Sequence, residues 1–140
     1  MGFWSPMHLH GFQCPTPESK VDPGIFFHEA LTTLSAINWV ARHHAFPNAR
    51  IAIMCDNQNT VDMFNSLHAR TPALNPILLT AVDLMIEFQF KLRVFWIEGE
   101  QNTVADALSR FDNARALDME PSLIISAFTP PRLTLGSEKK

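Results

Sequence analysis

Strand-like and helix-like segments alternate along the middle of this chain, from residue 29 to residue 110. In residues 29–44, apolar side chains recur at intervals of three and four positions, which predicts a helix with one apolar stripe. Residues 50–55 form a nearly continuous apolar run, which is typical of a parallel strand covered on both faces. The alternation therefore predicts an α/β fold, with helices packed on a mixed sheet.

The other expected elements follow from the same periodicities and from the turn residues between them. Strands are expected at residues 2–4, 11–14, 25–27 and 91–97, and helices at 59–67, 75–88 and 103–110. Asp22-Pro23-Gly24 is a turn signal. Residues 113–140 lack periodicity and carry three prolines, so we expect a connector or flexible tail after a domain at 1–112.

Composition excludes several classes of protein. With 140 residues, 46% hydrophobic and 18% charged, the chain is long and apolar enough for one folded domain. A net charge of −3 gives no general attraction for nucleic acid, although a nuclease module tethered to a basic partner stays compatible with it. Cys14 and Cys55 form no metal-binding or disulfide pattern, so we expect reduced thiols in an intracellular protein. No apolar run is long enough to cross a membrane, and no secretion signal is expected.

Three acidic residues lie where an α/β sheet places its functional sites. Asp56 directly follows the run at 50–55, and Asp106 lies in the helix after the strand at 91–97. Ligands of open α/β sheets bind beyond the carboxyl ends of the strands. Glu29 lies in the first turn of the first helix, beside its apolar stripe. Hydrolysis of phosphodiesters with two divalent ions needs converging carboxylates, because hard cations such as Mg²⁺ prefer oxygen ligands.

Each of these residues also has a purely structural interpretation. Asp56 is placed to cap the helix that follows it, and Glu29 and Asp106 interact favourably with helix dipoles without any metal. Four of the six histidines form two short pairs without further ligands, which favours loop or surface positions over a metal site; they are His8, His10, His43 and His44.

Three segments together resemble one known family. They are residues 26–31 (Phe-Phe-His-Glu-Ala-Leu), residues 53–61 (Ile-Met-Cys-Asp-Asn-Gln-Asn-Thr-Val) and residues 94–110, where a strand and a Gly-x-x-Asn-x-x-x-Asp turn precede Leu-Ser-Arg. In order and spacing, the chain up to about residue 112 is similar to the ribonuclease H domain of reverse transcriptases, in particular those of fungal-type retrotransposon polyproteins.

The resemblance implies a fold, a reaction and a set of site residues. The fold would be ribonuclease H-like, and the reaction would be hydrolysis of the RNA strand of an RNA–DNA hybrid. Glu29, Asp56 and Asp106 match three of the family's four metal-binding acids and would hold two Mg²⁺ or Mn²⁺ ions. The implied partners are the hybrid itself and an upstream polymerase domain of the polyprotein.

Two departures from the family bear on activity. The family's first strand, which carries its first aspartate, has no counterpart here, because residues 1–4 already resemble the second strand. Without that strand, we expect residues 2–4 either to pair directly with residues 50–55 or to form a loosely attached hairpin. Trp96 replaces a histidine of the family, and an indole N–H donates a hydrogen bond but does not shuttle protons. We therefore expect this chain, taken alone, to be inactive.

Two other functional interpretations remain open. One is a non-catalytic remnant or domesticated fragment that serves as a structural or interaction domain. The other is an integrase-like nuclease or transposase of the same superfold, against which the Leu-Ser-Arg helix argues.

Overall fold

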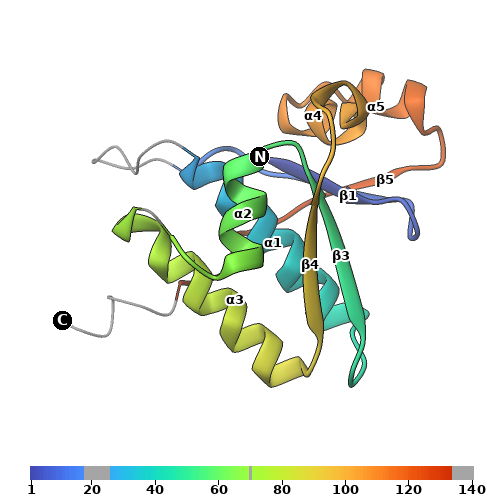
Figure 1. Ribbon diagram of the computed structural model, residues 1–140. Helices are drawn as coiled ribbons and strands as arrows, with labels where there is room; N and C mark the ends of the chain where they lie inside the picture. The colour runs from blue at the N-terminus through green and yellow to red at the C-terminus, as the bar shows by residue number, and fades with distance from the viewer. Residues whose placement is uncertain (18–25, 70, 134–140) are drawn as a thin grey trace.

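The computed structural model describes residues 1–17, 26–69 and 71–133 (Figure 1). In chain order the elements are β1 (Gly2–Ser5), β2 (His10–Gln13), α1 (Phe27–His43), β3 (Arg50–Cys55), α2 (Gln58–Ser66), α3 (Asn75–Phe88), β4 (Lys91–Trp96), α4 (Thr103–Ser109), α5 (Asn113–Met119) and β5 (Ile124–Ala127), with short 3-10 turns at Pro72–Leu74 and Gly99–Gln101. The helices and strands predicted between residues 29 and 110 are confirmed. The strand expected at 25–27 is wrong for its last two residues, since Phe26 is the left-handed N-cap of α1 and Phe27 begins that helix. Residue 25 and the Asp22 turn lie outside the described residues.

The strands form two separate sheets instead of one. β2 pairs antiparallel with β1 and parallel with β5, which makes a three-stranded mixed sheet. β3 and β4 pair parallel with each other in a second sheet. The fold is therefore mixed α/β, with a small mixed sheet flanked by helices, as predicted, and the strands are divided between two sheets.

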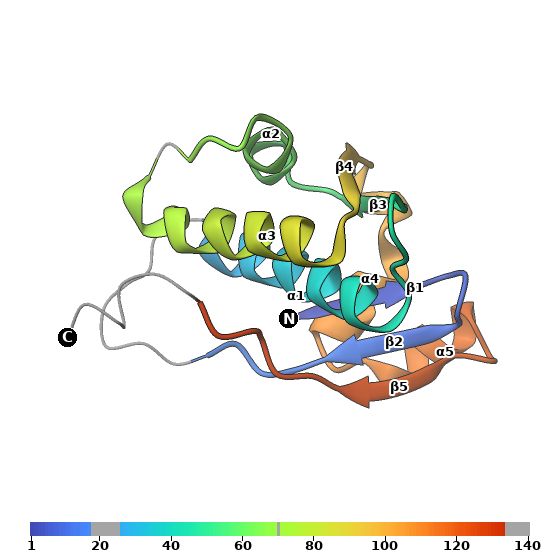
Figure 2. The same ribbon diagram turned by 90° about the horizontal axis from the view of Figure 1, so that it is seen from below.

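Helix α1 lies at the centre of the core. Its Leu34 and Ile37 have no exposed surface, and Ile77 of the neighbouring α3 is equally buried (Figure 2). Burial alternates along β3: Ile51 and Cys55 are buried, whereas the intervening positions are partly or fully exposed. The parallel pairing of β3 was predicted correctly, but its coverage on both faces was not, because helices cover one face only.

The hairpin β1–β2 is firmly packed and does not pair with β3 in the described structure. The Met1 amino group donates to the Cys14 carbonyl at 2.8 Å, and the rings of Phe3 and Phe12 stack at 4.9 Å. On the other face, Gly2 lies so close to α4 that a Cβ there would come within 2.6 Å of the Ser109 nitrogen. Direct pairing of residues 2–4 with residues 50–55 was therefore wrong. The alternative, a hairpin, is confirmed, but its contacts with α4 show that it is not loosely attached.

Regular structure continues past residue 112, contrary to the expected connector or tail. Asp112 caps α5 by accepting from the Arg115 N–H at 3.3 Å, and β5 extends the mixed sheet beside β2. The prediction for 113–140 was thus wrong for 113–127, where a short helix and a short strand offer too few residues for periodicity to show. Residues 134–140 lie outside the described part.

The close approach of Gly2 to α4 predicts a specific cost of substitution. Gly2→Ala would force its Cβ against the backbone of Leu108 and Ser109, and should lower the free energy of unfolding by roughly 1–3 kcal/mol. Gly99→Ala is the matched control, since its Cβ would meet only the Asp56 carboxylate at an ordinary 3.8 Å. Urea denaturation of both variants checks this, and an equal loss of stability in both would contradict the docking of β1 on α4.

Candidate functional site

Glu29 and Asp56 come together at the carboxyl end of β3. Glu29 lies in the first turn of α1, and Asp56 is the residue after β3. One potential ligand atom from each of Glu29, Cys55 and Asp56 lies within 4.8 Å of the others. Two of the three acids expected at the site are therefore adjacent.

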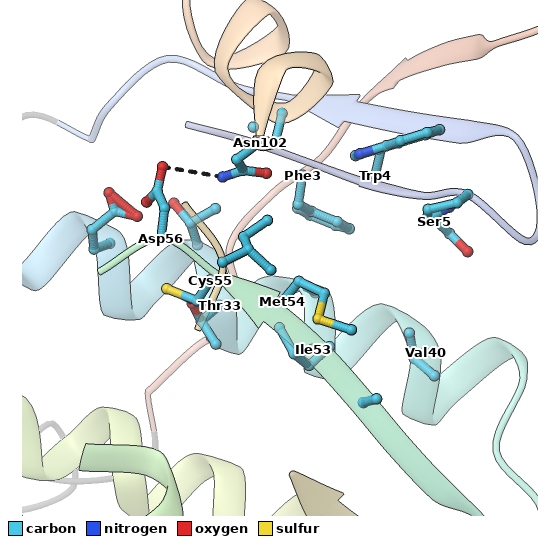
Figure 3. A pocket seen from close by; sticks show the side chains of 18 of the residues that line it. Phe3, Trp4, Ser5, Thr33, Val40, Ile53, Met54, Cys55, Asp56 and Asn102 are labelled. Atoms are coloured by element: carbon cyan, nitrogen blue, oxygen red, sulfur yellow. Dashed lines mark hydrogen bonds between the residues drawn. The ribbon is translucent and has the colours of Figure 1, made fainter. Parts of the chain in front are cut away.

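The structure removes the helix-capping interpretation of Asp56. The cap of α2 is Asn57, whose side-chain oxygen accepts from the Thr60 N–H at 3.0 Å. The Asp56 carboxylate instead accepts from the Asn102 side-chain amide at 3.3 Å (Figure 3). The sequence analysis did not anticipate this contact, although both residues follow neighbouring parallel strands whose carboxyl ends meet at one edge.

Burial and then the charge of Asp56 raise the pKa of Glu29 above its ordinary value. The second cause is the repulsion between two carboxylates that share a small volume. A cation bound between the two carboxylates would relieve that repulsion. Two carboxylates that repel each other in this way are therefore a suitable pair of ligands for a divalent ion.

Cys55 contributes differently from the two acids. Burial raises the pKa of the thiol, so that it stays protonated at neutral pH. Its sulfur receives a contact from the Asn57 N–H at 3.5 Å. A protonated thiol is a poor ligand for a hard cation, so the oxygens of Glu29 and Asp56 are the candidate ligands of this cluster.

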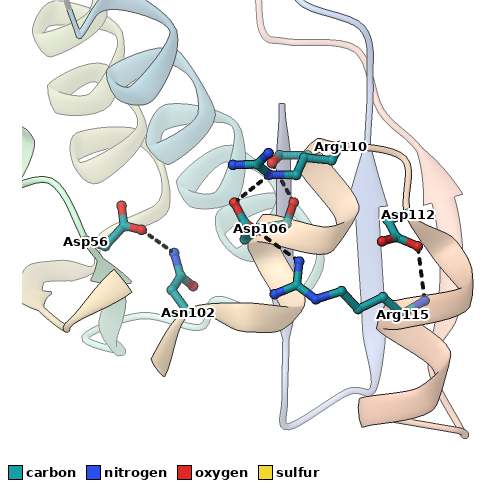
Figure 4. A network of polar contacts seen from close by, with 7 residues as sticks. Asp56, Asn102, Asp106, Arg110, Asp112 and Arg115 are labelled. Carbon is teal, nitrogen blue, oxygen red and sulfur yellow. Dashed lines mark hydrogen bonds and ion pairs between the residues drawn. The ribbon is translucent and has the colours of Figure 1, made fainter. Parts of the chain in front are cut away.

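Asp106, the third expected acid, is directed elsewhere. Its carboxylate accepts from Arg110 and from Arg115, each at 3.1 Å (Figure 4). Burial raises the pKa of Asp106, but the hydrogen bonds and charges of the two arginines outweigh it and lower the pKa below its ordinary value. The structure therefore brings Glu29 and Asp56 together and leaves Asp106 in an ion-pair cluster.

A pocket of about 330 Å³ adjoins the two acids and separates the two sheets. We call it the inter-sheet pocket. It is lined by β1, by one side of α1 and by β3, with Asp56 and Asn102 at one end (Figure 3). Glu29 also lines it, beside Asp56. Trp96, the residue in place of the family's histidine, is half exposed at the end of β4 and is not among the lining residues.

The four histidines of the two pairs surround Trp39 and do not converge with Glu29 and Asp56. The rings of His8 and His44 stack at 3.7 Å, and His10 stacks on Phe12 at 4.1 Å. Three or more histidines with converging ligand atoms do not occur among the described residues. The expected loop or surface position is confirmed for His8, His43 and His44, which are exposed, whereas His10 is half-buried in β2.

Comparison with known proteins does not identify a family. No protein-family model and no curated protein matches the chain. Within the described ranges, no helix has both the length and the apolar character needed to cross a bilayer.

The raised pKa of Glu29 predicts a pH-dependent effect on stability. The folded protein binds the Glu29 proton more readily than the unfolded chain, so the contribution of Glu29 is most favourable at low pH and is lost as pH rises through the folded pKa. Glu29→Gln should therefore raise the free energy of unfolding near pH 7 by a few tenths to about 1 kcal/mol, and have little effect near about pH 4. Urea titrations at both pH values test this, with Glu87→Gln on the exposed side of α3 as control.

The acid pair also predicts weak binding of a divalent ion. Mn²⁺ should bind more tightly than Mg²⁺, and Asp56→Asn should weaken Mn²⁺ binding by roughly tenfold or more, because it removes an anionic ligand. Asp62→Asn on the exposed face of α2 should leave the affinity unchanged. Paramagnetic broadening of amide signals measures both. If Asp56→Asn binds Mn²⁺ as the unaltered chain does, the ion does not use this site.

Proposed function

We propose that this chain is a ribonuclease H-like domain of the reverse-transcriptase type, whose chemistry is metal-dependent hydrolysis of RNA in an RNA–DNA hybrid. The observation that carries the proposal is the adjacency of Glu29 and Asp56 beyond the carboxyl end of β3. These two acids come from separate motifs of the chain, and the family resemblance requires the same two to meet.

The residues present fit one hard cation better than two. Glu29 and Asp56 supply carboxylate oxygens, and Asn102 holds the Asp56 carboxylate in one orientation through its amide. Further carboxylates are needed to hold two ions close together, and Asp106 is ion-paired with Arg110 and Arg115. A divalent ion bound here would supply a Lewis acid for phosphodiester hydrolysis.

The side chains of this chain would bind and orient a ligand, and among the described residues that line the pocket none is a histidine that could shuttle protons at the acid pair. Trp96 has an indole N–H, which donates a hydrogen bond but does not accept a proton. The thiol of Cys55 is buried and stays protonated. We therefore propose that the chain alone does not cleave hybrid at a useful rate, and that an acid supplied from outside it completes the site.

The alternative function is a non-catalytic domain derived from the same ancestor. The ion pairs of Asp106 favour it, because a carboxylate that neutralises two arginines serves the packing of α4 against α5 without any metal. The division into two sheets is compatible with the same interpretation.

Activity of an extended chain separates these two functions. We expect no cleavage of an RNA–DNA hybrid by the 140-residue chain in Mg²⁺ or Mn²⁺. Joining an extended segment that ends in aspartate ahead of Met1 should produce cleavage, and Trp96→His in that extended chain should increase it. A proton-transfer residue commonly contributes a factor of about 10²–10⁴.

The control is Asp56→Asn in the extended chain, which should abolish cleavage but leave hybrid binding nearly intact. An extended chain that folds and binds Mn²⁺ yet leaves the hybrid uncut would favour the non-catalytic domain. Rapid Mg²⁺-dependent hydrolysis by the unextended chain would contradict the proposed incompleteness of the site.

A further inference from the structure

One face of the β3–β4 sheet is open to solvent. Helices α1, α2 and α3 lie together on one side of these two strands (Figures 1 and 2), and the buried side chains of the strands belong to the core that these helices form. Because side chains alternate between the two faces of a strand, every second residue points to the other side. We call that side the open face, and its residues are all exposed: Arg50, Ala52, Met54, Lys91, Arg93 and Phe95.

The open face is positively charged, although the whole chain carries a net charge of −3. Half of its residues are cations and none is an acid. Arg50 and Lys91 lie directly opposite each other in the register of the two strands, and Arg93 follows two residues after Lys91. Like charges at directly opposed positions destabilise a sheet. An anion bound between Arg50 and Lys91 would remove that repulsion.

No carboxylate in the described part of the chain forms an ion pair with these three cations. The ion pairs within residues 1–17, 26–69 and 71–133 are those of Asp106 with Arg110 and Arg115. The Arg93 guanidinium instead lies over the ring of Phe95, with its central carbon 5.8 Å from the ring centre. A surface on which cations gather without acids is complementary to a polyanion.

An exposed aromatic ring lies beside the cations. Phe95 is 44% exposed, and Met54, directly opposite it in the register, is 56% exposed. Surfaces that bind single-stranded nucleic acid combine cations, which contact the phosphates, with aromatic rings, on which bases stack. A duplex covers the faces of its bases, and an acidic peptide has no base to stack. The ring and the cations together therefore favour a single strand of nucleic acid over either of these polyanions.

We propose that the open face binds a single strand of nucleic acid, with phosphates on its three cations and a base stacked on Phe95. The planar guanidinium groups of Arg50 and Arg93 suit a phosphate, because each can donate two parallel hydrogen bonds to it. The bound strand would follow β3 and β4, which extend for roughly 20 Å. Binding on this face needs no metal, so the proposal goes beyond the proposed function and does not depend on the acid pair.

Fluorescence anisotropy of a labelled oligothymidylate, added to the full chain in EDTA, tests the contacts with phosphate. Contacts with three phosphates should lower the affinity roughly fifteen- to twentyfold between about 50 and about 200 mM KCl. Lys91→Gln and Arg93→Gln should each weaken binding and reduce the slope of this salt dependence by about a third. Arg132→Gln makes the same charge change beside α1 and α3 and should bind normally. Equal weakening by Arg132→Gln would overturn the proposal, because net charge alone would then explain the binding.

Phe95→Leu separates base stacking from charge. It keeps an apolar side chain and all three cations, and should weaken binding of the oligothymidylate at least about fivefold while leaving a duplex of the same length unaffected. Phe111→Leu replaces another half-exposed ring, after α4, and should have no effect. Unchanged binding of the single strand by Phe95→Leu would overturn the stacked base. Displacement of the oligothymidylate by an equal concentration of oligoglutamate would overturn the preference for nucleic acid.

The same titrations separate the open face from the metal site. Asp56→Asn should leave oligothymidylate binding in EDTA unchanged, because Asp56 follows the last residue of β3 and EDTA removes divalent ions. Arg93→Gln should leave Mn²⁺ binding unchanged. Oligothymidylate binding by a chain that does not bind Mn²⁺ would support the open face and contradict the metal site. Mn²⁺ binding by a chain that does not bind oligothymidylate at low salt would overturn the open face alone.

Discussion

Helix α1 is the element on which both halves of the structure depend. It packs against β1 in the mixed sheet and against β3 in the two-stranded sheet, while α3 covers its other side. Its two fully buried residues, Leu34 and Ile37, each contribute roughly 1.5–3 kcal/mol by leaving water. Since no strand pairing joins the sheets within the described residues, the packing on α1 and the contact of β1 with α4 set their relative position.

The same helix determines the candidate site. Because the first turn of α1 lies at the carboxyl end of β3, Glu29 is brought next to Asp56 by the helix and the strand alone. The acid pair is therefore a property of one half of the structure, whereas the inter-sheet pocket belongs to both.

The periodicity of the sequence predicted most of the helices and strands correctly, but it did not predict how the strands pair or which side chains contact one another. The apolar run at 50–55 and the helix at 75–88 were found from periodicity, and the adjacency of Glu29 and Asp56 agrees with what the family resemblance implies. β5 was missed because its partner, β2, lies more than a hundred positions earlier in the chain, and a four-residue strand has no pattern of its own. The orientation of Asp106 was missed for a related reason, since Arg115 belongs to α5, a helix that the sequence pattern did not indicate.

The cluster around Asp106 holds that carboxylate only weakly. The side chains of Arg110 and Asp106 are 71% and 38% exposed, and that of Arg115 is 43% exposed. Ion pairs this open to solvent contribute about 0–1 kcal/mol each. Ala105, the preceding residue of α4, lines the inter-sheet pocket, whereas Asp106 does not. The carboxylate of Asp106 therefore belongs to the exposed surface of α4 and α5 in this structure and not to the acid pair.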